Sequence, residues 1–171
     1  MDLLIKKLND FSKQDFPIKQ VSRFLKNYTL SDLDKKKYEH YNNDYTRNLV
    51  YKDQSFEILI VCWGPKSSAP IHGHEGEKCW AKVLKGELTI NNYKQLSQNP
   101  LKLKQISSDI CKEGYLDGPA EIHSVKNISA ENSSSLHIYA KPYKECDIYD
   151  LKKNIITRKS LNYHSEFGKL S

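Results

Sequence analysis

Hydrophobic residues recur at helical spacing near the start of the chain and at strand-like spacing further along. The helical positions are Leu3, Leu4, Leu8 and Phe11, followed by Ile18, Val21, Leu25 and Tyr28. Pro17 suits a helix first turn, and Ser31 with Asp34 resembles a capping box that opens a third short helix ending near Tyr38. We therefore expect residues 1–42 to form a helical cap.

From Tyr45 onward the apolar runs are short, rich in β-branched and aromatic residues, and separated by turn residues. They occupy 48–51, 56–63, 79–84, 87–90, 121–125 and 135–140. Their close spacing leaves no room for crossover helices, which favours an antiparallel double-sheet barrel over a parallel α/β fold. The sequence thus predicts one mainly β domain over 1–171, with 43–171 forming the barrel and C-terminal strands.

Composition and charge narrow the range of functions. The chain carries 27 Lys and Arg against 21 Asp and Glu, but the basic residues are scattered, so we expect no nucleic-acid partner. No apolar run approaches the roughly 18 residues of a membrane span, and the N-terminal one is too short for a signal peptide. Four widely spaced cysteines without a CxxC pair are expected to be reduced thiols. We expect a cytoplasmic monomer without a membrane partner.

His72 and His74 form the most informative pattern in the chain. They stand one residue apart in a Gly- and Pro-rich loop before an apolar strand, so both rings leave the same face of an extended chain. This is a typical metal-ligand pattern, and His123 is a third candidate from another strand of the same sheet. Isolated His40 and His164 are expected to be surface or hydrogen-bonded core residues.

Cys79 leaves two possibilities for this centre. If it is not a ligand, three neutral imidazoles hold the metal with no negative charge from the protein, and an anionic substrate can supply that charge at the open positions. If its thiolate is a fourth ligand, the site is closed and structural zinc is indicated.

A second group of polar residues lies at 135–139. Ser135, His137 and Tyr139 share one face of a predicted strand, while Leu136, Ile138 and Ala140 take the other. The group is either a half-exposed strand with a solvated polar face or a relay in which Ser135 holds His137 and His137 orients the Tyr139 phenol.

The spacing around His72 and His74, and around His123 and Asn127, resembles the two motifs of the cupin superfamily, whose fold is a double-stranded β-helix or jelly-roll barrel. Within it the chain resembles cysteine dioxygenase, a thiol dioxygenase. The resemblance rests on Cys79 and on YTRNLV (45–50), CWGP (62–65), IHGH (71–74), LKGEL (84–88), HSV (123–125), SLHIY (135–139) and HSEFG (164–168).

This resemblance implies Fe(II) on His72, His74 and His123, with L-cysteine bound through its thiolate and amine and oxidised by O2 to cysteine sulfinate. It matches Arg47 to the arginine that binds the substrate carboxylate, a role that suits a guanidinium fork. The alternative for Arg47 is a surface salt bridge. Tyr45 resembles the family tyrosine that steadies this arginine. The reaction belongs to L-cysteine catabolism, and other enzymes decide whether the product goes to taurine or to pyruvate and sulfite.

The resemblance also implies a thioether crosslink between Cys79 and Tyr139, which would fix the phenol near the iron. The alternative is that Cys79 is simply a buried thiol. The family's Ser-Pro-Pro after the tyrosine is replaced here by Ala140-Lys141-Pro142, and Cys146 matches a family cysteine near the pocket mouth. Trp63 and Trp80 are expected in the core.

Two other functions compete with this one. A 3-mercaptopropionate or other small-thiol dioxygenase would share the iron site, but it would carry glutamine at the position of Arg47 and usually no crosslinking cysteine. A non-catalytic metal-binding cupin would not need Arg47 and the Ser135-His137-Tyr139 group together.

Overall fold

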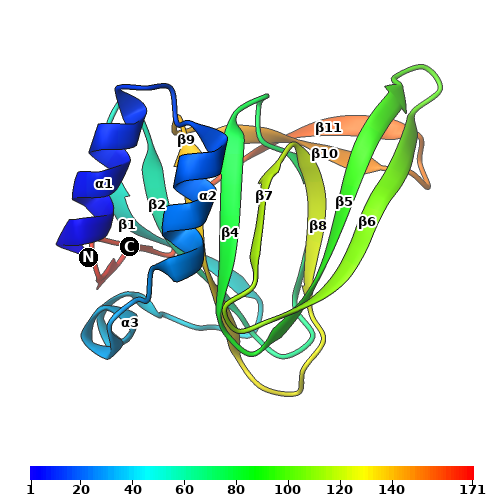
Figure 1. Ribbon diagram of the computed structural model, residues 1–171. Coiled ribbons are helices and arrows are strands. Elements are labelled where there is room, and N and C mark those ends of the chain that lie inside the picture. Colours follow the sequence, from blue (N-terminus) through cyan, green and yellow to red (C-terminus); the bar gives the residue numbers. More distant parts are fainter.

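Two β-sheets face each other in the middle of the molecule, and helices cover the outside of one of them (Figure 1). The computed structural model describes residues 1–171. The helices are α1 (Asp2–Ser12), α2 (Ile18–Asn27) and α3 (Asp32–Tyr38). All three were predicted, and the expected cap of α3 is confirmed, since the Ser31 side chain accepts a hydrogen bond from the backbone N–H of Asp34 at 3.1 Å. Pro17 stands one residue before α2, as its N-cap.

The strands follow in chain order. They are β1 (Tyr45–Lys52), β2 (Glu57–Trp63), β3 (Ser68–Gly73), β4 (Lys78–Lys85), β5 (Glu87–Ser97), β6 (Lys102–Lys112), β7 (Leu116–Ala120), β8 (Ile122–Asn127), β9 (Ser133–Ala140), β10 (Glu145–Asp150), β11 (Ile155–Ser160), β12 (Ser165–Glu166) and β13 (Lys169–Leu170). The six predicted runs all lie wholly or largely within strands, and β5 extends well beyond its predicted end at residue 90.

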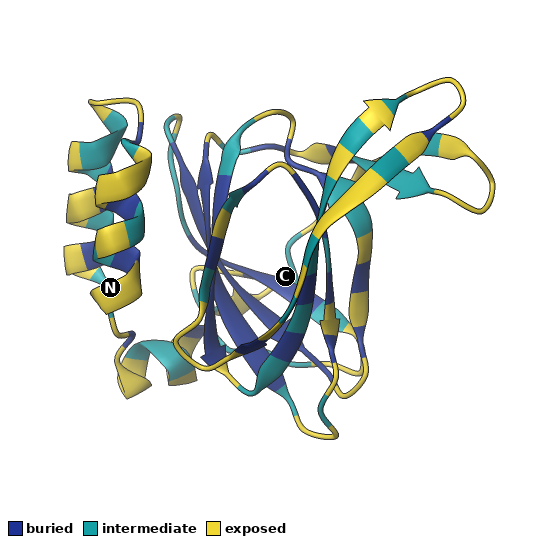
Figure 2. Ribbon diagram, turned by 45° about the vertical axis from the view of Figure 1, so that its right-hand side comes forward, coloured by how far each residue is buried: buried dark blue, intermediate teal, exposed yellow.

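The strands form a seven-stranded sheet in the order β13-β12-β1-β2-β9-β4-β7 and a six-stranded sheet in the order β11-β10-β3-β8-β5-β6. Pairing is antiparallel except between β1 and β12. This is the predicted cupin-type double-stranded β-helix with short N-terminal helices. The far end of the β5–β6 hairpin extends beyond the barrel and is largely exposed (Figure 2).

Two hydrophobic cores lie on opposite faces of the seven-stranded sheet. The outer core, 17 buried residues between this sheet and the helices, includes Leu4, Leu8, Val21, Leu25, Trp80, Leu136 and Ile138. The inner core, 14 buried residues between the two sheets, includes Leu59, Val61, Trp63, Cys79, Val83 and Tyr139. Because side chains alternate along a strand, β2 and β9 contribute to both cores and are buried along their whole length. Trp63 and Trp80 are core residues, as predicted.

A buried lysine fastens α2 to the barrel. The ammonium group of Lys82 on β4 donates hydrogen bonds to three backbone carbonyl oxygens at the end of this helix. They are those of Leu25 at 2.9 Å, Lys26 at 2.9 Å and Tyr28 at 2.6 Å. These are the carbonyls that the last helical turn cannot satisfy itself. Burial lowers the pKa of Lys82. None of the helices is both long and apolar enough to cross a bilayer.

Candidate metal centre and substrate pocket

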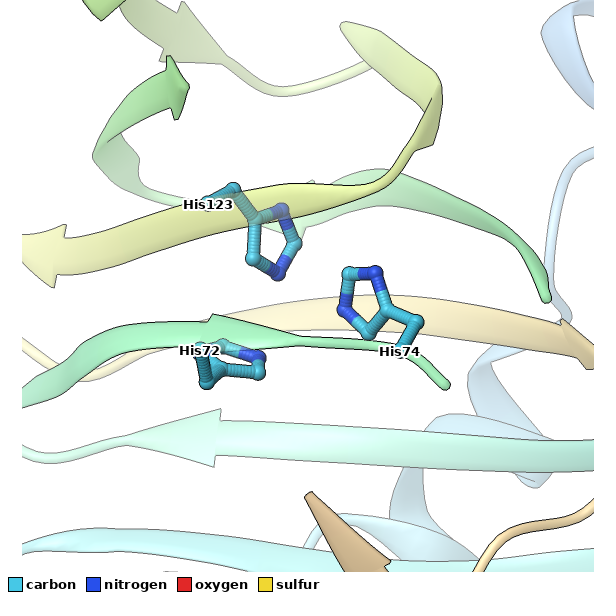
Figure 3. Close-up of side chains that lie close together, drawn as sticks. All are labelled: His72, His74 and His123. Carbon is cyan, nitrogen blue, oxygen red and sulfur yellow. The ribbon is translucent and has the colours of Figure 1, made fainter. Parts of the chain in front are cut away.

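Three histidines converge between the two sheets. His72 lies on β3 and pairs in register with His123 on the neighbouring β8, while His74 follows directly after β3 ends. One ring nitrogen from each residue lies within 4.8 Å of the other two, and Figure 3 shows the three rings turned toward a common space. The sequence placed the pair at the entry of a strand, but it stands at the end of β3, a strand that the Gly- and Pro-rich loop concealed.

In each ring the Nδ1 atom lies near an oxygen atom of the protein. The Nδ1 atoms contact the carbonyl oxygen of Pro70 at 2.8 Å (His72), that of Ala120 at 3.0 Å (His74) and the Asp117 carboxylate at 3.8 Å (His123). A carbonyl can only accept, so Nδ1 of His72 and His74 carries the proton and Nε2 keeps its lone pair. The Nε2 atoms of His74 and His123 are buried and have no partner.

The surroundings keep these imidazoles neutral. Burial lowers the pKa of His72 to about 4, and burial with the neighbouring rings lowers the pKa values of His74 and His123 well below the usual range. Neutral imidazole is the form that binds metals. Three such rings with converging, unpaired nitrogens therefore fit a divalent transition-metal ion.

Asp117 is a feature of this centre that sequence reasoning missed. It lies on β7 and is 8% exposed; its Oδ1 accepts a hydrogen bond from Asn92 at 3.0 Å, whereas Oδ2 has no hydrogen-bond partner. Oδ2 instead faces the equally unpartnered Nδ1 of His123. A carboxylate behind a histidine fixes the ring and its tautomer, which is the usual support of a metal ligand. Burial raises the pKa of Asp117.

Ser135, His137 and Tyr139 form a buried chain on the inner face of β9. The Trp63 indole N–H donates to the Ser135 hydroxyl at 2.9 Å. Ser135 lies 2.9 Å from Nε2 of His137, and the Tyr139 hydroxyl lies 3.1 Å from Nδ1 of the same ring. All three side chains are at most 4% exposed. The alternative of a solvated polar face is therefore wrong.

The direction of this chain follows from the partners of Ser135. Its hydroxyl oxygen accepts from the Trp63 N–H, and Nε2 of His137 is the one acceptor within reach of its own proton, so Ser135 donates to Nε2 and the ring proton is assigned to Nδ1. That N–H then donates to the Tyr139 oxygen, leaving the phenol proton free for another acceptor. Burial lowers the pKa of His137 to about 3 and raises that of Tyr139, so both groups are neutral.

Cys79 lies on β4 directly opposite Tyr139 on β9, and both side chains belong to the inner core. Burial raises the pKa of its thiol well above the ordinary value. The group of converging metal-ligating atoms contains the three histidines and not Cys79. The geometry therefore speaks against a fourth, thiolate ligand.

Arg47 extends from β1 into the same interior and is 8% exposed, so the alternative of a surface salt bridge is wrong. Its Nη2 lies 3.4 Å from the buried Glu57 carboxylate, and its Nη1 is buried without a partner. Tyr45 makes no hydrogen bond to Arg47; its ring stacks on Trp63 with ring centroids 5.4 Å apart. No hydrogen bond therefore supports the expected steadying of Arg47 by Tyr45.

One pocket joins these groups. Its lining comprises Tyr45, Arg47, Val61, Trp63, Ala69, Pro70, His72, His123, Val125, His137, Tyr139, Tyr143, Cys146, Ile148, Lys159 and Leu161. The predicted Cys146 is thus at the pocket, where it is buried. Tyr143 was missed, although its ring lies 5.0 Å from that of Tyr139 and 6.1 Å from that of His74. His40 and His164 lie outside the histidine group and are half-buried; Nε2 of His40 is buried without a partner, so this residue is not the surface or hydrogen-bonded histidine that was expected.

The sequence is similar to that of one known protein family. The sequence model of the family described as "Cysteine dioxygenase type I" matches residues 2–152. The chain is 30% identical to "Cysteine dioxygenase type 1" of Homo sapiens over 137 residues, 77% of this chain and 68% of that protein. It is 27% identical to the Danio rerio protein of the same name over 175 residues, 96% of this chain and 86% of that protein.

Among solved structures, the fold is similar to that of TT1209 from Thermus thermophilus, with a TM-score of 0.52 and 20% identity. The match covers 67% of this chain and 98% of that one. It is also similar to an oxalate oxidase structure, with a TM-score of 0.51 and 17% identity, covering 66% of this chain and 58% of that one. At these identities the likeness concerns the fold alone.

Proposed function

The chain belongs to the cysteine dioxygenase type I family, and on this premise we propose that it oxidises the thiol of L-cysteine with O2 to cysteine sulfinate, using Fe(II). Membership of the family makes it a dioxygenase, and the histidine group fits a metal site. The observation that carries the finer proposal is the lining of one pocket by His72, His123, Tyr139 and Arg47, whose Nη1 is free. A metal-coordinating end and a carboxylate-binding end suit a small amino acid with a thiol.

His72, His74 and His123 would hold the Fe(II). When bound, this ion supplies open coordination positions and the one-electron redox chemistry that lets O2 react with a thiol. The three imidazoles are neutral, so the ligand set brings no negative charge. An anionic, deprotonated substrate is favoured in such a site because it provides the compensating charge.

Arg47 would bind the substrate carboxylate. Its Nη1 is buried with all its donors unused, and leaving a buried charged donor unsatisfied costs on the order of 1–3 kcal/mol. A carboxylate would satisfy it through a charge-assisted hydrogen bond. Tyr139, held by His137 and Ser135, would donate its free phenol proton to the substrate or to dioxygen within the pocket, where a fixed donor stabilises developing negative charge.

Oxygen uptake with Fe(II)-reconstituted protein tests the proposal. We expect L-cysteine to gain two oxygen atoms, seen by mass spectrometry, at one O2 consumed per thiol. Protein treated with a chelator and reloaded with Zn²⁺ is the control, because zinc has no accessible redox change and should support no uptake. Bound iron without thiol-coupled uptake would leave a non-catalytic metal-binding cupin as the better explanation.

A 3-mercaptopropionate dioxygenase is the second candidate, and Arg47 distinguishes the two. Arg47→Gln should raise the KM for L-cysteine by about tenfold to a hundredfold while affecting 3-mercaptopropionate much less. Equal losses with both thiols would contradict the role assigned to Arg47.

The Cys79–Tyr139 thioether remains part of this proposal, supported by the direct pairing of the two residues across β4 and β9. Its formation joins sulfur to a ring carbon, with loss of the thiol hydrogen and one ring hydrogen and transfer of two electrons to O2. Protein purified after aerobic turnover should yield a joined peptide lighter by two hydrogen atoms than its two parts. Cys79→Ser protein treated identically should not, and two separate unmodified peptides from the wild type would contradict the crosslink.

We also propose that the unit acts alone, as one domain over 1–171 and a cytoplasmic monomer. Light scattering during gel filtration should report a single 19.9 kDa species, and a dimeric mass would correct this expectation.

A further inference from the structure

Glu57 is a carboxylate inside the barrel that no part of the proposed reaction uses. It begins β2 directly opposite Tyr139 on β9 and is 0% exposed. A buried carboxylate is rare unless it is paired. We propose that Glu57, together with Tyr163, is a positioning unit that aims Arg47 at the substrate carboxylate and thereby sets affinity for amino-acid thiols. This inference rests on the proposed function.

The contacts of Glu57 divide between its two oxygens. Oε1 lies 3.4 Å from Nη2 of Arg47. Oε2 accepts a hydrogen bond from the Tyr163 hydroxyl at 2.6 Å and lies 3.7 Å from the Lys52 ammonium. Lys52 also donates to the Tyr163 oxygen at 2.9 Å. Oε1 therefore contacts Arg47, and Oε2 is held in place by Tyr163 and Lys52.

Tyr163 restrains Arg47 in a second way. The guanidinium carbon lies 5.3 Å from the centroid of the Tyr163 ring, within cation–π range. With Glu57 on one edge and an aromatic ring nearby, the edge that carries the unpartnered Nη1 is the one left for a ligand. A side chain fixed in this way loses less conformational entropy when a carboxylate binds.

The charges of the cluster also suit a monoanion. Arg47 and Lys52 contribute two positive charges and Glu57 one negative charge, which leaves one positive charge for one substrate carboxylate. Without Lys52, Glu57 would neutralise Arg47; without Glu57, two cations would lie close together with no compensating group. Burial raises the pKa of Tyr163, so the phenol remains a donor to Glu57.

The C-terminal segment is fastened to the strand that carries Arg47. The backbone N–H of His164 donates to the Arg47 carbonyl at 2.8 Å, and Ser165 donates to the Asn48 side chain at 2.8 Å. The short strand β12 pairs in parallel with β1 at the same place. Tyr163 is thus held in register with Arg47 although 116 positions separate them (163 minus 47).

Tyr163→Phe is the sharpest test, because it keeps the ring beside Arg47 and removes only the hydroxyl. The matched control is Tyr51→Phe, which also removes a phenol-to-carboxylate hydrogen bond, the one to Asp53 at 2.9 Å, away from the pocket. Steady-state oxidation of L-cysteine by the Fe(II)-loaded enzyme gives kcat and KM. Competition by cysteamine, which has the thiol and amine of cysteine but no carboxylate, gives an inhibition constant for a ligand that Arg47 does not recognise.

For Tyr163→Phe we expect a KM for L-cysteine raised about fivefold to tenfold, an almost unchanged kcat and an unchanged inhibition constant for cysteamine. Tyr51→Phe should leave all three at wild-type values. Glu57→Gln should raise the KM for L-cysteine in the same selective way; a lower KM would mean that Glu57 only opposes anion binding, which overturns the inference.

Three other results would also overturn it. An unchanged KM in Tyr163→Phe, or a parallel rise in the KM for cysteine and the inhibition constant for cysteamine, would assign Glu57 and Tyr163 a purely structural role while leaving the proposed function intact. A wild-type enzyme that does not oxidise cysteine at all would instead remove the proposed function, and this inference with it.

Discussion

The two faces of strand β9 are equally buried, but one is apolar and structural and the other carries polar groups of the candidate site. On the outer face, Leu136, Ile138 and Ala140 join the apolar core beneath the helices. On the inner face, Ser135, His137 and Tyr139 form the hydrogen-bonded chain that reaches the pocket. Burial alone therefore does not distinguish structural from functional positions here; what distinguishes them is whether the buried group is apolar or polar.

The barrel interior, toward which the inner face of β9 points, contains buried polar groups without partners, whereas the outer face of β9 is apolar. A buried polar group costs about 1–3 kcal/mol when it lacks a hydrogen-bond partner. The chain from Trp63 to Tyr139 is satisfied, but Nη1 of Arg47, Nε2 of His74, both ring nitrogens of His123 and Oδ2 of Asp117 are not. Such groups fit a site whose partners are a metal and a substrate, and the apolar outer core offsets their cost.

The largest expected effect on the inner side comes from His123→Ala. We expect it to abolish stoichiometric iron binding and to lower cysteine oxidation by at least about a thousandfold, since the redox metal is lost. The thermal midpoint of the metal-free protein should change little, because the variant removes two unsatisfied buried nitrogens along with the ring. Metal analysis, oxygen uptake and calorimetry measure the three quantities.

The matched control for this variant is His164→Ala, which alters a half-buried histidine outside the metal-ligating group. It should keep its iron and its activity. Wild-type iron content in His123→Ala would remove His123 from the ligand set.

On the outer side, Leu136→Ala should destabilise the protein by about 2–5 kcal/mol through lost apolar burial and the cavity left behind. Its activity per folded molecule should stay within about twofold of wild type, because the side chain points away from the pocket. Urea unfolding monitored by tryptophan fluorescence, with kinetics in the absence of urea, tests both statements.

The adjacent inner-face variant completes this pair. Ser135→Ala should lose activity about tenfold to a hundredfold with a smaller change in stability, since it breaks the chain to Tyr139. If Leu136→Ala and Ser135→Ala changed stability and activity in the same proportion, the assignment of a structural role to the outer face and a functional role to the inner face would be wrong.

A smaller effect is expected at Asp117. Asp117→Leu should weaken metal affinity by about tenfold to a hundredfold, because His123 loses the carboxylate that faces its Nδ1 at 3.8 Å. Asp117→Asn keeps the shape and an acceptor oxygen and should recover most of the affinity. Competition with a chromophoric chelator measures the dissociation constants directly; equal values for wild type and Asp117→Leu would show that Asp117 does not support His123.

The smallest effect is expected at Cys79. Cys79→Ser should lower kcat only about twofold to tenfold, because the relay still positions the Tyr139 hydroxyl without a crosslink. Stability should fall slightly, since a buried thiol is replaced by a more polar hydroxyl. Wild-type kcat in Cys79→Ser, measured on protein whose wild-type counterpart carries the thioether, would show that the crosslink has no catalytic role.

Local patterns in the sequence were enough to predict many of the residues of the site. His72 and His74 share a face because of their spacing, and the alternation from Ser135 to Ala140 predicted one polar and one apolar face. The helices of the cap follow from apolar spacing and from the Ser31 cap. Strand β3 was missed because Gly and Pro residues interrupt it, and the end of β5 was missed because its second half is polar and partly exposed.

The sequence by itself determined which residues carry metal-binding and hydrogen-bonding chemistry, because a period of two in a strand and the ligand chemistry of histidine are local properties. Only the tertiary structure decided which distant groups meet them. Asp117 stands behind His123, Lys82 holds the end of α2, and Glu57 with Tyr163 flanks Arg47. Such pairings depend on sheet order and on how a C-terminal segment returns to β1, and a single strand pattern contains neither.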